Sequence, residues 1–403
     1  MLVQGVISPE DLESWVTGTT VDIVAPYESV GGHAEGIGTS ARYGAHAEGY
    51  KTKAYGDFSH AEGYVTIAGM YSHAEGKGTE AKAPAAHAEG WDTKALGEAS
   101  HAEGWETTAS GSYSHSGGYQ TTASGYSSHA EGAGTTASGS YSHAEGGNTV
   151  ASGNYSHAAG LGTQSKHIQT VIGQYNTVSS AGDTSYNAAN EIFIIGNGTG
   201  TGARGNAFKV LGNGNTYADA AYTSTGADYA EMFEWVDGNT ENEDRVGFFV
   251  TLDGDKIRKA TASDSYIAGV ISATPSIIGD AGGLRWQGKY ITDDWGRVQY
   301  QDVLVPAGYD TEGRLLADER VDSHPVLNPE WDGQEIYTPR SDRQEWAAVG
   351  MMGKLLVRDD GTCVVNGFCK PNDDGIATPS VTTVNSYRVM KRVGENIVQI
   401  LVK

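Results

Sequence analysis

Cationic residues, cysteines and long apolar runs are all scarce in this 403-residue chain. Lys and Arg number 27 against 50 Asp and Glu, which gives a net charge of −23 and argues against binding to nucleic acid or anionic membrane surfaces. No apolar stretch approaches the roughly 20 residues of a membrane helix. The two cysteines, Cys363 and Cys369, are too few for a disulfide scaffold. We therefore expect no nucleic-acid partner and no membrane insertion.

The N-terminal residues 1–30 read as a lead-in segment. They lack the basic start and long apolar core of a secretory signal, so we expect synthesis and assembly in a cytoplasm. Within SPEDLESWV, Ser8 is a suitable N-cap and Pro9 suits the first helical position, with acidic residues in the first turn. This pattern predicts one short helix.

A fixed repeat dominates residues 31–176. Ten of the twelve histidines open the motif H-A-E-G or a near variant, at spacings of 13 or 14 residues. Such a short, constant period is the signature of a solenoid. The ten histidines are His33, His46, His60, His73, His87, His101, His115, His129, His143 and His157.

Fourteen residues can hold two short strands and two tight turns. The glycine of H-A-E-G is expected to end the first strand, and Ala-Ser-Gly the second, because glycine supplies the positive φ that tight turns require. Coils stacked about 4.8 Å apart would make ten layers about 50 Å long. Residues alternate faces along a strand, so His and Glu share one side and Ala takes the other.

The predicted interior is thin because its inward residues are mostly Ala, Ser, Thr and Gly. At about 25 cal/mol per Å² of buried apolar surface, such a core is weak for an isolated chain. Association of several chains along the coils would supply the missing burial. The repeat therefore predicts an oligomer, without fixing the number of chains.

The repeat SHAEG-x-x-T-x-ASG, closing in HIQTVIGQYN at residues 167–176, resembles the head repeats of YadA-type trimeric autotransporter adhesins. The resemblance implies a left-handed parallel β-roll made by a homotrimer. From the sequence we expect neither the coiled-coil stalk nor the membrane anchor of those adhesins, and similar repeats occur in phage tail fibres and appendages. We therefore expect a phage or prophage fibre that binds a host-surface receptor, either a glycan or a protein. A bacterial surface adhesin is the alternative.

The histidine column has two interpretations. Imidazoles beside carboxylates can bind metal ions or a receptor. We favour a structural His–Glu hydrogen-bond ladder, because the variants HSGG at His115 and HAAG at His157 keep the histidine and lose the glutamate. No metal and no cofactor are expected. The ladder residues are His60, His73, His87, His101, His129 and His143.

The repeat stops after residue 176, and residues 177–227 follow a different pattern. Short β-branched and aromatic runs alternate with Asn-Gly and Gly-Asn, which is typical of hairpins. No G-x-x-x-x-G-K-[ST] phosphate loop is present. We expect a small β-rich transition module.

Composition changes again at residue 228. Five of eight tryptophans and seven of ten prolines lie beyond it, and the His-Ala-Glu motif is gone. Residues 228–403 therefore predict a mixed, β-rich globular domain of ordinary size.

Four motifs of this region resemble the intramolecular-chaperone autoproteolytic domain, the glutamic-type peptidase G2 family of phage pre-neck appendage proteins. They are GADYAEMFEW (226–235), DDWGRV (293–298), PRSDRQEWAAVGMMGK (339–354) and GTCVVNGFCK (361–370). The resemblance implies a domain that trimerises, directs folding of the fibre and then cuts itself away. The product would reside in the virion after assembly in the host cytoplasm.

The resemblance places the scissile bond at Ala227–Asp228. It implies Glu231 as the acid/base residue, with Asp228 assisting. Taken alone, two carboxylates three residues apart are usually surface acids, so the resemblance carries the assignment. A carboxylate with a raised pKa can activate water or protonate a leaving amine. In the family, the residue before the aspartate can be a serine, whose hydroxyl could accept the acyl group. Here this residue is Ala227, which has no hydroxyl, so cleavage through such an acyl shift is excluded.

Three cations are candidate partners of the developing oxyanion: Arg340, Arg343 and Lys354. If the bond is not cut, the C-terminal domain would instead be a permanent trimerisation cap. The only enzymatic activity expected is this single-turnover cleavage.

Overall fold

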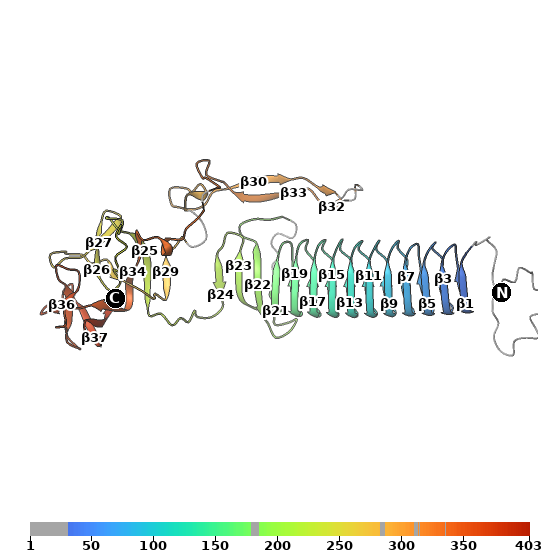
Figure 1. The fold of residues 1–403 in the computed structure, drawn as a ribbon, viewed down its shortest axis with the longest axis horizontal. Coiled ribbons are helices and arrows are strands. Elements are labelled where there is room, and N and C mark those ends of the chain that lie inside the picture. Colours follow the sequence, from blue (N-terminus) through green and yellow to red (C-terminus); the bar gives the residue numbers. More distant parts are fainter. Residues whose placement is uncertain (1–30, 179–184, 283–286, 310–312, 314, 335) are drawn as a thin grey trace, which may run out of the picture. The chain divides into compact units, whose positions relative to one another are not determined.

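A computed structural model describes residues 31–178, 185–282, 287–309, 313, 315–334 and 336–403. The helix predicted at SPEDLESWV lies outside the described residues. The chain divides into two compact units, residues 1–221 with 300–324 and residues 222–299 with 325–403 (Figure 1). The helical elements of the described part are two 3-10 turns, η1 (Gln287–Lys289) and η2 (Arg340–Asp342). None of its helices is long and apolar enough to span a membrane.

The first unit is built on a β-solenoid, as the repeat predicts. Each coil contributes one five-residue strand and one two-residue strand, and each kind pairs in parallel with its copy in the next coil (Figure 1). The register places histidine beside histidine and glutamate beside glutamate, as between His87 and His101. The five-residue strands are β1 (His33–Ile37), β3 (His46–Tyr50), β5 (His60–Tyr64), β7 (His73–Lys77), β9 (His87–Trp91), β11 (His101–Trp105), β13 (His115–Tyr119), β15 (His129–Ala133), β17 (His143–Gly147), β19 (His157–Leu161) and β21 (Thr170–Gln174).

The two-residue strands form a second parallel sheet, which lies across the coil from the first. They are β2 (Ser40–Ala41), β4 (Lys53–Ala54), β6 (Ile67–Ala68), β8 (Glu80–Ala81), β10 (Lys94–Ala95), β12 (Thr108–Ala109), β14 (Thr122–Ala123), β16 (Thr136–Ala137), β18 (Val150–Ala151) and β20 (Gln164–Ser165).

The glycine of H-A-E-G lies inside its strand, and the expectation that it ends the strand is wrong. Gly104 has φ +103°, and a Cβ added to it would lie 2.2 Å from the carbonyl oxygen of Gly118 in the next coil. Glycine is therefore required both for this backbone angle and for the close approach of neighbouring coils. The ladder continues for one residue beyond it.

The solenoid interior consists of small side chains, as the alternation of the strand predicts. In a typical coil, Ala102, Thr107 and Ala109 are fully buried, and Ser114 is almost so. The hydroxyl of Ser114 donates to the carbonyl oxygen of Gly111 at 2.6 Å. Most of the ordering of each coil therefore comes from backbone hydrogen bonds repeated in register.

Residues 185–221 extend the first sheet and change its pairing. Strand β22 (Glu191–Asn197) pairs in parallel with β21, whereas β23 (Asn206–Leu211) and β24 (Thr216–Ala218) add in antiparallel fashion. The Arg204 guanidinium donates to the carbonyl oxygens of Gly162 and Asn176 at 3.0 and 3.1 Å. The Asn-Gly-rich segment is thus continuous with the last coil.

A hairpin from much later in the sequence belongs to the same unit. It includes β30 (Tyr300–Val305) paired with β33 (Arg320–Pro325), and β31 (Gly308–Tyr309) paired with β32 (Leu315–Ala317). The backbone N–H of Tyr186 donates to Asp322 Oδ1, and the N–H of Ser323 donates to the carbonyl of Tyr186, both at 2.8 Å. No sequence pattern predicted this contact.

The second unit is a curled sheet rich in antiparallel pairs. Its strand order is β27-β26-β28-β34-β38-β37-β35-β36, and β25 joins it between β34 and β29. Large side chains fill its core, among them Phe249, Leu355 and Ile400. The predicted β-rich fold is confirmed. The strands are β25 (Asp228–Glu234), β26 (Phe249–Asp253), β27 (Lys256–Lys259), β28 (Gly269–Ile271), β29 (Ile277–Gly279), β34 (Trp346–Arg358), β35 (Phe368–Pro371), β36 (Ala377–Ser380), β37 (Tyr387–Gly394) and β38 (Ile397–Val402).

Candidate functional site

Both predicted catalytic carboxylates lie on β25. This strand pairs in antiparallel fashion with β34 and in parallel with β29. Its burial alternates: Asp228, Ala230 and Met232 are buried, whereas Tyr229 and Glu231 are half-buried. A bulge in β34 opposite Tyr229 and Ala230 interrupts the regular pairing beside the predicted cleavage point.

Backbone donors hold the carbonyl oxygens of both Ala227 and Asp228. The N–H of Lys354 donates to the carbonyl oxygen of Ala227 at 3.2 Å, and the N–H of Ser276 donates to the carbonyl of Asp228 at 2.8 Å. Gly353 has φ +115°, and a Cβ there would lie 2.3 Å from the Ala227 oxygen. Only glycine therefore lets β34 approach this carbonyl so closely.

The Asp228 side chain is buried, with 6% of its surface exposed. Burial raises the pKa of this carboxyl, while hydrogen bonding to the Ser272 side chain and to its own backbone N–H opposes the rise. Its Oδ2 has no hydrogen-bond partner among the described residues. Gly350 packs against it, since a Cβ on Gly350 would lie 2.9 Å from Oδ2. Ser272 also lines an open groove of about 770 Å³.

Glu231 lies on the other face of β25. The Tyr229 hydroxyl donates to Glu231 Oε1 at 2.5 Å, and this bond raises the pKa of Tyr229. Gly279 on β29 makes room for the pair, because a Cβ there would lie 2.7 Å from the Tyr229 hydroxyl oxygen. Residues three apart on a strand are about 10 Å apart and point to opposite faces. One chain therefore does not bring Glu231 and Asp228 together.

The three candidate cations have different surroundings. The buried Arg340 pairs with Asp280 and stacks on Trp346, and the Arg343 guanidinium donates to Glu345 at 2.8 Å. Lys354 acts at the predicted cleavage point through its backbone N–H, which donates to the carbonyl oxygen of Ala227. Tyr229, Ser272 and Gly353 were not predicted from the sequence. Tyr229 could have been found from the sequence. If D-Y-A-E forms a strand, residues 229 and 231 lie on the same face, so Tyr229 is expected beside Glu231.

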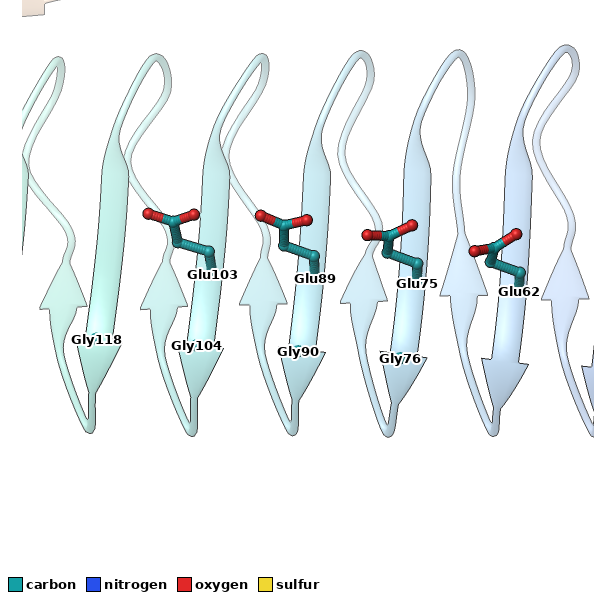
Figure 2. A pocket seen from close by; sticks show the side chains of 8 residues that line it. All are labelled: Glu62, Glu75, Gly76, Glu89, Gly90, Glu103, Gly104 and Gly118. Carbon is teal, nitrogen blue, oxygen red and sulfur yellow. The ribbon is translucent and has the colours of Figure 1, made fainter.

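The His–Glu repeat forms a continuous column on the solenoid surface. The rings of His60 and His73 stack with centroids 4.7 Å apart and planes 1° apart, and His87 stacks on His101 at 4.8 Å. Glutamates of successive coils point the same way (Figure 2). They lie near the imidazoles, as between His60 Nε2 and Glu62 at 3.5 Å and between His101 Nε2 and Glu89 at 3.8 Å. The stacking repeats at His129 and His143.

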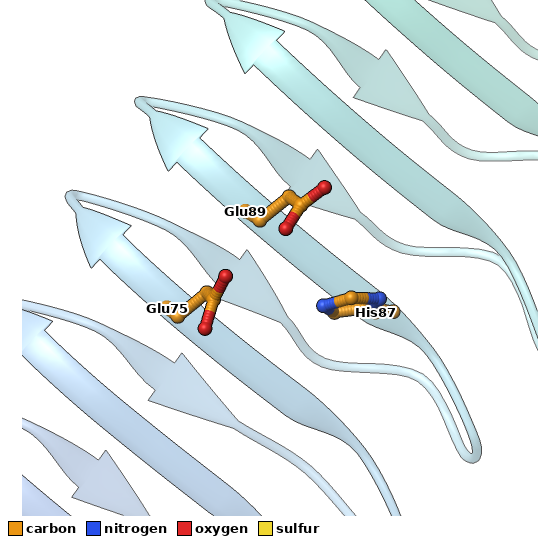
Figure 3. Close-up of side chains that lie close together, drawn as sticks. All are labelled: Glu75, His87 and Glu89. Carbon is orange, nitrogen blue, oxygen red and sulfur yellow. The ribbon is translucent and has the colours of Figure 1, made fainter.

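In several coils this column brings three potential metal ligands within 4.8 Å of one another. One such group is Glu75, His87 and Glu89 (Figure 3). Burial and the neighbouring histidines lower the pKa of His73, His115 and His143, while nearby glutamates partly offset this effect. The imidazoles stack in register, but Nε2 of His60, His73 and His87 has no hydrogen-bond partner among the described residues, so the predicted His–Glu hydrogen-bond ladder stays a prediction.

The family model described as "Peptidase_G2, IMC autoproteolytic cleavage domain" matches residues 184–396. The chain is 35% identical over 179 residues to a pre-neck appendage protein of Bacillus phage B103, covering 43% of this chain and 19% of that protein. It is 38% identical over 184 residues to the putative phage-related protein YobO of Bacillus subtilis strain 168, covering 45% of this chain and 20% of that protein. The chain thus matches about a fifth of the length of these relatives.

Among solved structures, the pre-mature bacteriophage phi29 gene product 12 aligns over 92% of this chain and 40% of its own, at 20% identity and a TM-score of 0.44.

Proposed function

Because the chain belongs to the Peptidase_G2 family of IMC autoproteolytic cleavage domains, we propose that it cuts its own Ala227–Asp228 bond once, after folding. Membership of this family confirms the resemblance of the C-terminal motifs. The match begins at residue 184 and ends at residue 396, so it includes strands β22 to β24 as well as the second unit up to β37.

The geometry around Ala227–Asp228 is the observation that carries this proposal. The carbonyl that would be attacked accepts a hydrogen bond from the Lys354 N–H. The nitrogen that would leave belongs to Asp228, whose buried carboxyl has a raised pKa and interacts with that same N–H. A carbonyl with a fixed donor and a leaving amine with an adjacent acid are the two features that peptide hydrolysis needs.

The reaction then follows from these groups. A water molecule attacks the Ala227 carbonyl carbon and gives a proton to a base, the role that the family resemblance assigns to Glu231. The negative charge that forms on the carbonyl oxygen is stabilised by the Lys354 N–H. The protonated Asp228 carboxyl transfers its proton to the amide nitrogen as the C–N bond breaks. One water is consumed, and the products are a carboxylate on Ala227 and an amino terminus on Asp228.

We propose that the solenoid released by this cleavage is part of a homotrimeric phage fibre or appendage that binds a host-surface glycan or protein. Relatives named as pre-neck appendage proteins support the virion setting. The small-residue core supports association, because each coil buries little apolar surface by itself. Exposed aromatics in register, such as Trp91 stacked on Trp105 at 4.6 Å, offer contact surface along the rod.

The test is to express the full chain and follow it by denaturing gel and intact-mass analysis. Fragments that meet at Ala227–Asp228 are expected for the wild type and not for Glu231→Gln. Glu234→Gln is the matched control, because Glu234 lies on the same strand and pairs with Lys256 at 2.6 Å. An uncut wild-type chain in its assembled form would show that the second unit is a permanent cap.

A further inference from the structure

We propose that the His–Glu column of the solenoid binds divalent transition-metal ions such as Zn²⁺. Each ion is held by one histidine and by the glutamates of the same coil and of the coil before it. This inference does not depend on the proposed cleavage. It replaces the purely structural ladder that the sequence favours, because of how the ligands converge, which imidazole nitrogens lack partners and how the glutamate charges are arranged.

The potential ligands converge on one point in a single coil. Glu75, His87 and Glu89 each offer one ligand atom, and these atoms lie within 4.8 Å of one another (Figure 3). Zn²⁺ lies about 2.0–2.2 Å from its nitrogen and oxygen ligands, so two ligands of one ion are at most about 4.4 Å apart. Small rotations of the glutamate side chains therefore bring all three onto one ion. Two further groups with the same spacing are Glu89, His101 and Glu103, and Glu131, His143 and Glu145.

The histidines of these groups have an unsatisfied ring nitrogen. Nε2 of His87, His101 and His143 is buried and has no hydrogen-bond partner among the described residues. Nε2 of His101 lies 3.8 Å from a Glu89 oxygen, and Nε2 of His143 lies 4.0 Å from a Glu131 oxygen, which is too long for a hydrogen bond. Buried polar atoms without a partner are costly. An ion between imidazole and carboxylate would satisfy both groups.

The glutamates of the column form a row of like charges. Glu62, Glu75, Glu89 and Glu103 line an open groove of about 480 Å³ (Figure 2). Parallel pairing sets Glu89 directly opposite Glu75 on one side and Glu103 on the other, and like charges in such positions repel. In the described part of the chain, these four glutamates form ion pairs only with histidines. A divalent cation would neutralise two carboxylates at once.

The donor atoms select the class of metal. One imidazole with two carboxylates suits Zn²⁺ and related transition metals, whereas Ca²⁺ and Mg²⁺ prefer ligand sets made of oxygen alone. Three protein ligands also leave a coordination position for water. Because the ladder fixes the backbone of all three ligands in register, the site is largely formed before the ion binds.

The sequence of the repeats sets the number of ions. Glu89 belongs to two of the three groups, so we expect one ion to be shared between the coils of His87 and His101. The coil of His115 has Gly117 in place of the glutamate, which interrupts the row. A second, separate ion is expected at His143.

Zinc binding to the full-length chain tests the inference. The protein is treated with EDTA, dialysed, equilibrated with Zn²⁺ and freed of unbound metal, and the zinc that remains is measured by plasma mass spectrometry. The wild type should bind one more ion per chain than the double variant His87→Gln/His101→Gln. It should bind two more than the triple variant that also carries His143→Gln. Zinc should raise the melting temperature of the wild-type solenoid and leave that of the triple variant unchanged.

Glu106→Gln is the matched control. It removes an acidic charge from the coil of His101, but the Glu106 carboxylate accepts a hydrogen bond from Gln120 and lies outside the three groups. This variant should bind as much zinc as the wild type. An equal loss in the control would indicate diffuse attraction to an acidic surface and would overturn the inference.

Two further outcomes contradict the inference. If the wild type binds no zinc, or no more than the triple variant, the column is not a metal site. Should the triple variant not fold, as judged by circular dichroism, X-ray absorption at the zinc edge of the zinc-loaded wild type decides. Oxygen ligands with one imidazole per ion are expected there. Sulfur, which would place the ion at Cys363, or oxygen alone would show that the inference is wrong.

Discussion

The solenoid and the C-terminal unit achieve order in opposite ways. In the solenoid, buried Ala, Thr and Ser contribute little apolar burial, and in-register backbone ladders provide the regularity. In the C-terminal unit, Trp235, Phe249, Leu355 and Ile400 are buried and make a conventional core. A repeat of this kind depends on its neighbours, whereas a core of large side chains stabilises a domain by itself. This difference predicts that the C-terminal unit is stable by itself, whereas each repeat is stable only when stacked on its neighbours.

The largest expected effect comes from filling the glycine column. Gly104→Ala places a Cβ 2.2 Å from a backbone oxygen at φ +103°, so neither the coil nor its neighbour can adjust cheaply. We expect a loss of more than about 3 kcal/mol, seen as a lower melting temperature and as proteolysis within the repeats. Ser110→Ala, at an exposed position in the same coil, is the control and should be neutral.

The matching change in the other region is Phe249→Ala. It should cost about 3–5 kcal/mol of the stability of the C-terminal unit by leaving a cavity. Intact-mass analysis should show that cleavage is lost with it. The contrast between the regions would be wrong if Phe249→Ala damaged the repeats first, or if Gly104→Ala unfolded the C-terminal unit and spared them.

The acid of the cleavage reaction is the next test. Asp228→Asn should slow cleavage by about 10²- to 10⁴-fold, because the leaving nitrogen loses its proton donor. In the wild type the rate should fall as pH rises through the raised pKa of Asp228, since only the protonated form donates. Time courses by denaturing gel at several pH values measure both effects. A cleavage rate that does not decline with pH would contradict the role of Asp228.

The same pKa shift has a consequence for stability. The folded state holds the Asp228 proton more tightly than the unfolded state, so the free energy of unfolding falls as pH rises between the unfolded and the folded pKa. In an uncut Glu231→Gln background, adding Asp228→Asn should remove this part of the pH dependence. Denaturant unfolding at pH 4 to 7 measures it.

A smaller effect is expected from the tyrosine that holds Glu231. Tyr229→Phe removes one hydrogen bond to a carboxylate, worth about 1.5–3 kcal/mol, so cleavage should slow by roughly 10- to 100-fold and its pH profile should shift. Tyr222→Phe, at an exposed tyrosine, is the control. An unchanged pH profile would mean that Tyr229 only packs beside Glu231.

The two regions also differ in what the sequence could predict. In the repeats, the fixed period gives equivalent residues of every coil the same position. The burial of Ala102 and Thr107 and the alignment of His87 with His101 can therefore be predicted from the pattern of one coil. The site required pairings between distant segments. Asp228 and Glu231 are named by their motif, but Gly353 reaches the bond from more than a hundred residues away, and no local pattern encodes that register. The placement of Asp228 and Glu231 on opposite faces can be predicted once this segment is taken as a strand, because residues three apart on a strand point to opposite faces.

The smallest effect should come from the histidine column. His73, His115 and His143 have pKa values below 6.5, chiefly because of burial, so the unfolded chain binds protons more readily than the folded one. Stability of the solenoid is therefore fully present above pH 6.5 and is lost as pH falls from there through the lowered values. We expect a melting temperature a few degrees lower at pH 5 than at pH 8. Replacing His73 and His143 by Gln should reduce the difference in melting temperature between pH 5 and pH 8. An equal melting temperature of the wild-type solenoid at both pH values would contradict this prediction and would mean that the imidazoles accept protons without loss of stacking.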